Sequence, residues 1–185
     1  MLLNARNNLF KFSFPKGFFD KDIKDKYERY LKNTSIPFKT LEGFINHTIQ
    51  SVTFPDLSAN LVEQKGKYNV ATKFRGGFDA IRNLNRTFTV EFKHVDAFLN
   101  YYALIESFFK FHEHQAKVEF LPDISLTLYN SDILGTVKVN YGQILYEAIP
   151  SALSLNYSDV RNSFKTFSVT FAYNTIEFDF DFIED

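Results

Sequence analysis

The chain has 185 residues, with 21 basic and 22 acidic side chains and no cysteine. A formal net charge of −1 leaves no surplus of cations to release counterions from a nucleic-acid backbone, which disfavours tight nucleic-acid binding. Without cysteine there is no disulfide framework, no thiolate metal ligand and no cysteine nucleophile.

The composition favours a β-rich fold. There are 23 phenylalanines and 10 tyrosines, and large rings fit pleated, half-buried strands better than helix interiors. The length suits one domain, so we expect a single domain over residues 1–185. No run of about eighteen apolar residues occurs and the N-terminus lacks the apolar core of a secretory signal, so we expect neither membrane insertion nor export.

The N-terminal part mixes strand and helix. A strand is predicted over residues 9–14 and ends at a Pro-Lys-Gly turn. A short helix follows at about 20–31, with Asp20 as its N-cap. Residues 40–55 have the pattern of extended chain. The apolar side chains of the helix recur at i, i+4, i+7 and i+8 and are Ile23, Tyr27, Tyr30 and Leu31.

Residues 56–77 are more polar than their neighbours. A hairpin could form about Lys65–Lys67, but the weak apolar pattern favours a long polar arm within the domain.

The centre of the chain is predicted to be a strand and a helix. Residues 86–93 alternate apolar and polar side chains. The helix, at about 95–111, carries two apolar stripes and so needs cover on two sides. One stripe contains Phe98, Leu99, Tyr102, Ile105 and Phe109. The other, a candidate subunit interface, contains Tyr101, Leu104, Phe108 and Phe111.

After this helix the sequence becomes a series of short strands separated by turn signals, at the spacing of an antiparallel β-sandwich or barrel. The predicted strands are residues 117–120, 124–128, 134–141, 144–149, 152–157, 164–173 and 176–182.

No constellation favours catalysis. The sequence has no nucleophile elbow and no phosphate-binding loop. His112 and His114 are the nearest approach to a metal pair, but no third ligand has identifiable spacing, so a polar helix end is the better reading. We therefore expect no enzyme activity and no cofactor.

The C-terminal string IEFDFDFIED is the most distinctive in the chain. It places Ile176, Phe178, Phe180 and Phe182 on one face of a strand, and Glu177, Asp179 and Asp181 on the other. One interpretation is an edge strand kept soluble by its charges. The other is an interface strand, in which Phe178 and Phe180 pack into a partner by β-augmentation.

The order of features over about two-thirds of the chain resembles the tail tube proteins of long-tailed bacteriophages and related contractile injection machines. The strands DISLTLYNSD, GTVKVNYGQILYEAIPSALSLNYSD and FKTFSVTFAYN occur in that order at residues 123–132, 135–159 and 164–174. The strand and helix RTFTVEFKHVDAFLNYYALIESFF and the earlier strand INHTIQSVTFPDL resemble parts of the same fold.

This resemblance implies a subunit that joins sheets with copies of itself into a hexameric ring, with rings stacking into a conduit for DNA ejection. Partners would be further copies and other tail, sheath or baseplate proteins, with DNA as transient cargo that is not bound specifically. The location would be the virion tail, assembled in the host cytoplasm. Lumen-facing acids would be Glu177, Asp179 and Asp181. The arm to the next ring would include Gln64, Lys65, Gly66, Lys67 and Tyr68.

Two segments depart from the simple tube pattern, namely the helix at 20–31 and the extension over 175–185. They keep open a tube initiator or baseplate ring protein of the same fold. An alternative of another class is a monomeric ligand-binding β-barrel that uses its rings to hold a sugar or apolar molecule.

Overall fold

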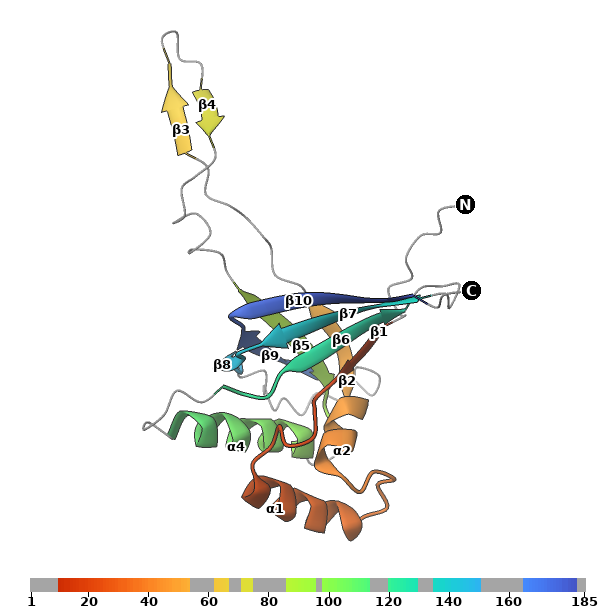
Figure 1. The fold of residues 1–185 in the computed structure, drawn as a ribbon. Helices are drawn as coiled ribbons and strands as arrows, with labels where there is room; N and C mark the ends of the chain where they lie inside the picture. Colours follow the sequence, from red (N-terminus) through yellow and green to blue (C-terminus); the bar gives the residue numbers. More distant parts are fainter. Residues whose placement is uncertain are drawn as a thin grey trace.

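A computed structural model describes residues 10–53, 62–66, 71–74, 86–95, 98–113, 120–129, 135–150 and 165–182. Two four-stranded antiparallel sheets form its centre, a layer of helices lies on one side, and a separate hairpin lies on the other (Figure 1). The predicted mainly β class with flanking helices is confirmed.

The first sheet has the strand order β1-β6-β7-β10. Its pairings are in continuous register, so side chains line up in rows across the sheet. One face is apolar and the other polar, as alternation requires. The strands are β1 (Phe10–Ser13), β6 (Ile124–Tyr129), β7 (Gly135–Gly142) and β10 (Thr175–Phe182).

The second sheet has the order β2-β5-β9-β8. Both of its edge pairings contain an irregularity, at Ile49/Ser51 in β2 and at Tyr146/Ala148 in β8. Its strands are β2 (Ile49–Thr53), β5 (Thr87–Lys93), β8 (Leu145–Ala148) and β9 (Thr166–Ala172).

The core is built from aromatic rings between the two sheets. Phe88 of β5 stacks on Tyr141 of β7 with ring centroids 4.5 Å apart, and on Phe171 of β9 at 5.3 Å. Phe12 of β1 meets Phe88 edge-on. Within the described residues the two sheets remain separate, and the rings between them leave a packed sandwich instead of an open barrel.

The turn before the first helix forms as its residues predict. Gly17 has φ +86°, a conformation that side chains with a Cβ rarely adopt. Helix α1 (Lys21–Lys32) then begins at Asp20, whose carboxylate accepts a hydrogen bond from the backbone N–H of Asp22. Ile23, Tyr27 and Leu31 are buried, while Tyr30 is exposed.

One helix contradicts the sequence-based expectation. Residues 41–47, predicted as extended chain, form helix α2 (Leu41–His47). Leu41, Phe44 and Ile45 lie at i, i+3 and i+4 and are buried together, which gives one helical turn a dry face. Burial of this apolar cluster stabilises the helix, and the extended chain begins only with the β-branched residues after it, in β2.

Helix α4 (Leu99–Glu113) packs on the second sheet. Tyr101 meets Phe167 of β9 edge-on at 5.1 Å, and Phe108 and Phe111 contact Tyr146 of β8. The ion pair between Lys26 and Glu106 links α1 to α4. The apolar face of the second sheet is therefore shared between the first sheet and the helices.

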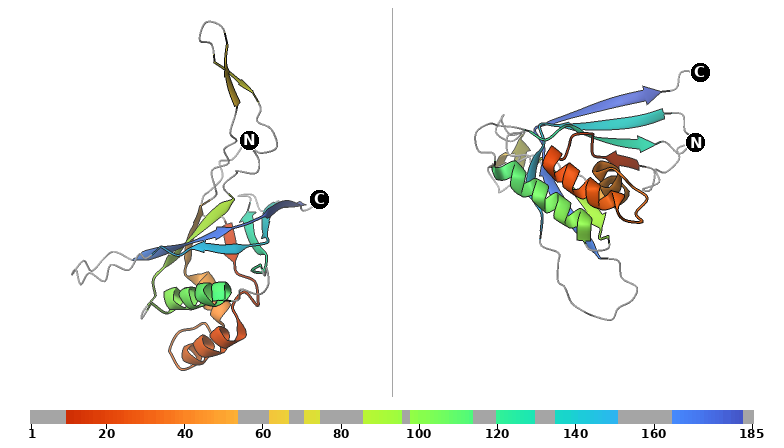
Figure 2. Two further views of the ribbon diagram at one scale, coloured as in Figure 1. Left: turned by 90° about the vertical axis from the view of Figure 1, so that its left-hand side faces the viewer. Right: turned by 90° about the horizontal axis from the view of Figure 1, so that it is seen from below.

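The third sheet is the hairpin β3 (Val62–Lys65) with β4 (Ala71–Phe74), in place of an arm without secondary structure. Two views place it beyond the sheets, at the end of the molecule opposite the helices (Figures 1 and 2). The strand predicted over 152–157, and most of that over 117–120, lie outside the described residues.

Candidate assembly surfaces

Among the described strands, β10 pairs along one edge only. Its neighbour is β7, with Ile176 opposite Tyr141, Phe178 opposite Val139 and Phe180 opposite Val137. These apolar positions therefore belong to the face that forms the core elsewhere in the sheet.

The apolar face of β10 is largely exposed. Ile176, Phe178 and Phe180 are 39%, 60% and 57% exposed, whereas Val139 and Tyr141 on the neighbouring strand are buried. Viewed from the helix side, β10 is the edge of the sheet farther from the helices (Figure 2). The apolar side chains are thus buried on β7 but exposed on the adjacent strand β10.

The opposite face of β10 is acidic. Glu177, Asp179 and Asp181 are exposed and lie opposite Asn140, Lys138 and Thr136 of β7. The three predicted lumen acids therefore share one face of one sheet. Phe182 belongs to the strand, but its side chain lies outside the described set.

The predicted arm is only partly described. Gln64, Lys65 and Gly66 are exposed on and beside β3, while Lys67 and Tyr68 lie outside the described residues. At the base of the hairpin Val62 lies opposite Phe74, and both are exposed. The hairpin thus carries an apolar pair that is open to contact.

The structure corrects the predicted interface on α4. Tyr101 and Leu104 are buried in the core of their own chain, and Phe108 and Phe111 are partly buried against it. In the other stripe Tyr102 is 49% and Phe109 60% exposed. Its remaining members, Phe98, Leu99 and Ile105, are partly buried against the core. Two apolar stripes showed that the helix has two dry sides, but not which side faces inward.

An ion pair between Lys24 and Glu42 connects helices α1 and α2. The Lys24 ammonium donates to the buried carboxylate of Glu42 at 2.8 Å, and the backbone N–H of Gly17 donates to the same oxygen at 3.4 Å. Burial alone would raise the pKa of Glu42, but the hydrogen bonds from Lys24 and from the backbone of Glu42 and Gly17 outweigh it, and the net pKa lies below the usual value. The carboxylate is thus ionised at neutral pH and ties α1, α2 and the turn together.

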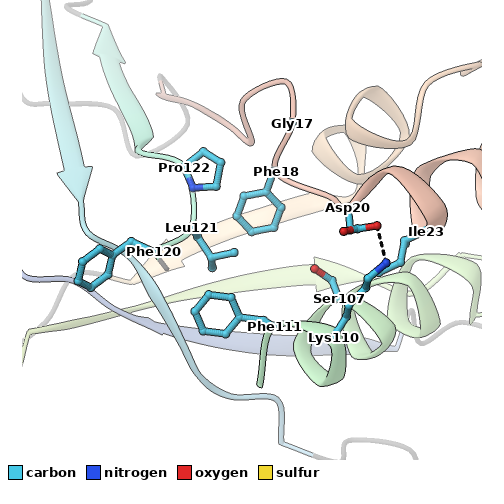
Figure 3. A pocket seen from close by; sticks show the side chains of 10 residues that line it. All are labelled: Gly17, Phe18, Asp20, Ile23, Ser107, Lys110, Phe111, Phe120, Leu121 and Pro122. Atoms are coloured by element: carbon cyan, nitrogen blue, oxygen red, sulfur yellow. Dashed lines mark hydrogen bonds and ion pairs between the residues drawn. The ribbon is translucent and has the colours of Figure 1, made fainter. Parts of the chain in front are cut away.

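A small cavity lies between the turn before α1, helix α4 and residues 120–122 (Figure 3). Phe18, Phe111 and Leu121 give it an apolar wall, and Lys110, paired with Asp20, borders it. Its volume is about 190 Å³, below the roughly 300 Å³ at which sites for drug-sized ligands begin.

Groups for metal chemistry are sparse in the described part of the chain, where no cluster of three or more His, Cys, Asp or Glu side chains could hold an ion. His112 is exposed near the end of α4, and His114 lies outside the described residues. None of the described helices is long and apolar enough to cross a bilayer.

No protein-family model matches the chain, and a search of curated proteins finds no match. Three solved structures show a loose likeness, each over 71% of this chain. The tube-terminating cap of the anti-feeding prophage shares 11% identity over 79% of its own chain, with a TM-score of 0.44. The sheath/tube terminator of PVC, an extracellular contractile injection system, shares 14% over 84%, with a TM-score of 0.46. The PVC sheath-tube complex shares 15% over 80%, with a TM-score of 0.47. At these TM-scores the likeness says nothing by itself of this chain's role.

Proposed function

We propose that this protein is a structural subunit of a phage-tail-like tube, which works by joining copies of itself into rings that stack around a conduit for DNA. The observation that carries the proposal is β10, which pairs along one edge only among the described strands and has an exposed apolar face and an acidic face behind it. The ordered resemblance of the sequence to tail tube proteins supports the same role.

An exposed, apolar edge strand is a liability for a monomer. Natural sheets usually protect their edges, because an open edge with apolar side chains recruits other chains. β10 has eight residues, longer than a typical protected edge. A partner strand would satisfy its backbone, and the same partner could cover Ile176, Phe178 and Phe180, which is the pattern of β-augmentation.

The remaining surfaces suit stacking. The hairpin β3–β4 and the helices lie at opposite ends of the molecule (Figure 1), so a hairpin that contacts the next ring would make a second, head-to-tail contact. Contacts between unlike surfaces build rings when the rotation closes and filaments when it does not. The net charge of −1 and the acids on β10 would let DNA pass without being held.

A tube initiator or baseplate ring of the same fold remains the closest alternative. Such a protein would use the same lateral contact but would form one ring and present a different surface to its neighbour. Repeated stacks in the purified protein favour a tube subunit, whereas isolated rings favour the initiator.

The structure gives no support to a ligand-binding barrel. Among the described residues the space between the sheets is filled by packed rings, and the cavity described above is smaller than sites for drug-sized ligands.

The test compares two phenylalanines with the same exposure. Phe178 on β10 and Phe109 on α4 are each 60% exposed, so replacing either by serine should barely change the stability of the monomer. We expect the wild-type protein and Phe109→Ser to form rings or tubes in negative-stain micrographs at high concentration, and Phe178→Ser to remain a folded monomer by light scattering and circular dichroism. A wild-type protein that stays monomeric at high concentration with a nucleating tail complex would contradict the proposal, as would unchanged assembly of Phe178→Ser.

A further inference from the structure

We propose that β10 of one copy pairs antiparallel with β1 of the next copy, with Lys11 facing the acids of β10, so that one sheet continues from subunit to subunit. The inference rests on the proposed self-assembly and names the partner surface, which the exposure of β10 alone does not identify.

Strand direction makes the pairing possible. All three pairings in the order β1-β6-β7-β10 are antiparallel, so β1 and β10, three positions apart, run in opposite directions. When a neighbouring copy keeps the same orientation along the sheet, its β1 arrives antiparallel to β10. The alternation of directions then continues without a break.

The two faces restrict the register. On β1, Phe10 and Phe12 belong to the apolar face, because they lie opposite Leu128 and Leu126 of β6. A shift by one residue would place these rings on the polar face, so only shifts by two residues match like with like. The apolar rows that would be extended are Phe10–Leu128–Val137–Phe180 and Phe12–Leu126–Val139–Phe178.

No allowed register then brings like charges opposite each other. Lys11 is exposed on the polar face of β1, between Phe10 and Phe12. A two-residue shift can bring four positions of β10 opposite it, of which Glu177, Asp179 and Asp181 are acidic and Thr175 is neutral. Opposite charges facing each other across strands stabilise a pair, whereas like charges destabilise it.

The other edges of the two four-stranded sheets fit less well. Two copies of β10 paired with each other would bring acids opposite acids. The edge strands of the second sheet, β2 and β8, each carry an irregularity that disturbs a continuous ladder, and the exposed side chain of β8 is Glu147, a further acid. The pairing of β1 with β6 is regular over its whole length.

Cysteine cross-linking tests the pairing directly, because the wild-type chain has no cysteine. Lys11→Cys is combined in turn with Glu177→Cys, Asp179→Cys and Asp181→Cys, and assembled protein is oxidised and run on a non-reducing gel. Asp179→Cys with Gln50→Cys on β2 or with Glu147→Cys on β8, and Asp179→Cys alone, are the controls. We expect a ladder of multimers for one of the three Lys11 combinations, because β-carbons facing each other across strands lie within disulfide distance.

The outcomes separate the two proposals. A ladder from the β2 or β8 control, a dimer from Asp179→Cys alone, or assembly without a ladder in any Lys11 combination would overturn the β10–β1 pairing while leaving self-assembly intact. Absence of assembly at high concentration with a nucleating complex would overturn the proposed function and the pairing with it.

A charge exchange provides a second readout. Lys11→Glu alone, and the triple variant Glu177→Lys/Asp179→Lys/Asp181→Lys alone, should each raise the concentration needed for assembly by about fivefold or more. The four substitutions together should restore assembly towards the wild-type concentration. Full assembly of the triple variant alone, with no effect of Lys11→Glu, would contradict a charge pairing at this junction.

Discussion

His94 follows strand β5 and sits among aromatic rings, with Phe98 and Phe167 at 4.9 and 4.8 Å between ring centroids. Neither ring nitrogen has a hydrogen-bond partner among the described residues. Burial, helped by the nearby charge of Lys165, lowers the pKa of His94 below its usual value, so the folded protein holds the neutral imidazole.

This predicts a pH-dependent loss of stability. The unfolded chain takes up a proton at the ordinary histidine pKa of about 6.5, while the folded chain resists protonation until a lower pH. The contribution of His94 is therefore fully present above that value and is lost as the pH falls towards the folded pKa.

His94→Phe should raise the free energy of unfolding by about 1 kcal/mol, because it removes two unpaired buried nitrogens, and should flatten the decline between pH 7 and 5. Urea unfolding at several pH values checks both. If His94→Phe lowered the stability equally at every pH, the larger phenyl ring would not fit the space that the imidazole occupies.

At the scale of the element, Asp20 combines two roles at the start of α1. Its carboxylate caps the helix through the backbone N–H of Asp22, and it also pairs with Lys110 of α4. The cap satisfies a backbone donor, whereas an ion pair at the surface contributes little.

Asp20→Ala should therefore lower the free energy of unfolding by about 1 kcal/mol, and Asp20→Asn, which keeps the capping oxygen, by much less. Denaturant unfolding followed by circular dichroism measures both. Equal losses in the two variants would assign the effect to the pair with Lys110.

Helix α4 allows its two stripes to be told apart by adjacent residues. Tyr101 is buried against Phe167, while Tyr102, the next residue, is half exposed. Tyr101→Asp should destabilise the chain by more than about 3 kcal/mol, because it buries an unpaired charge, and Tyr102→Asp should leave a folded protein. Thermal unfolding decides between them, and a stable, folded Tyr101→Asp would place the core side of α4 elsewhere.

The same helix shows which features a sequence pattern cannot predict. Alternation in residues 86–93 predicted β5, because this strand buries one face and the period of two is local. The inward side of α4 depends on rings that lie far away in the chain, among them Phe167. For α2, Leu41, Phe44 and Ile45 are too few to show a helical period before the core that buries them is known.

For the whole molecule, the hairpin β3–β4 can be separated from the rest. Its eight strand residues are exposed, so replacing residues 62–74 by a short Gly-Ser linker should change the free energy of unfolding by less than about 1 kcal/mol. If the hairpin reaches the next ring, this variant should form single rings and no tubes in negative-stain micrographs. A linker of 13 Gly and Ser residues, matched in length, controls for the spacing, and full-length tubes from either variant would exclude an inter-ring role.

The sequence predicted only part of the candidate interface. IEFDFDFIED showed a strand with a dry and an acidic face, and the residues Phe178 and Phe180 are indeed the exposed ones. That β10 pairs with β7, and that no other described strand pairs with it, follows from long-range register, which no local pattern contains.

The unequal lengths of the two outer strands have a mechanical consequence. β1 has four residues and β10 has eight, so a seam between subunits would contain about half the ladder that holds β10 to β7. Outward pressure in a closed ring pulls the strands apart sideways. The contact between subunits would then break before the strand pairing inside a subunit. Mild denaturant should therefore release folded monomers, seen as loss of large particles by light scattering while circular dichroism is unchanged. Loss of both signals together would mean that the subunit is no stronger than its seams.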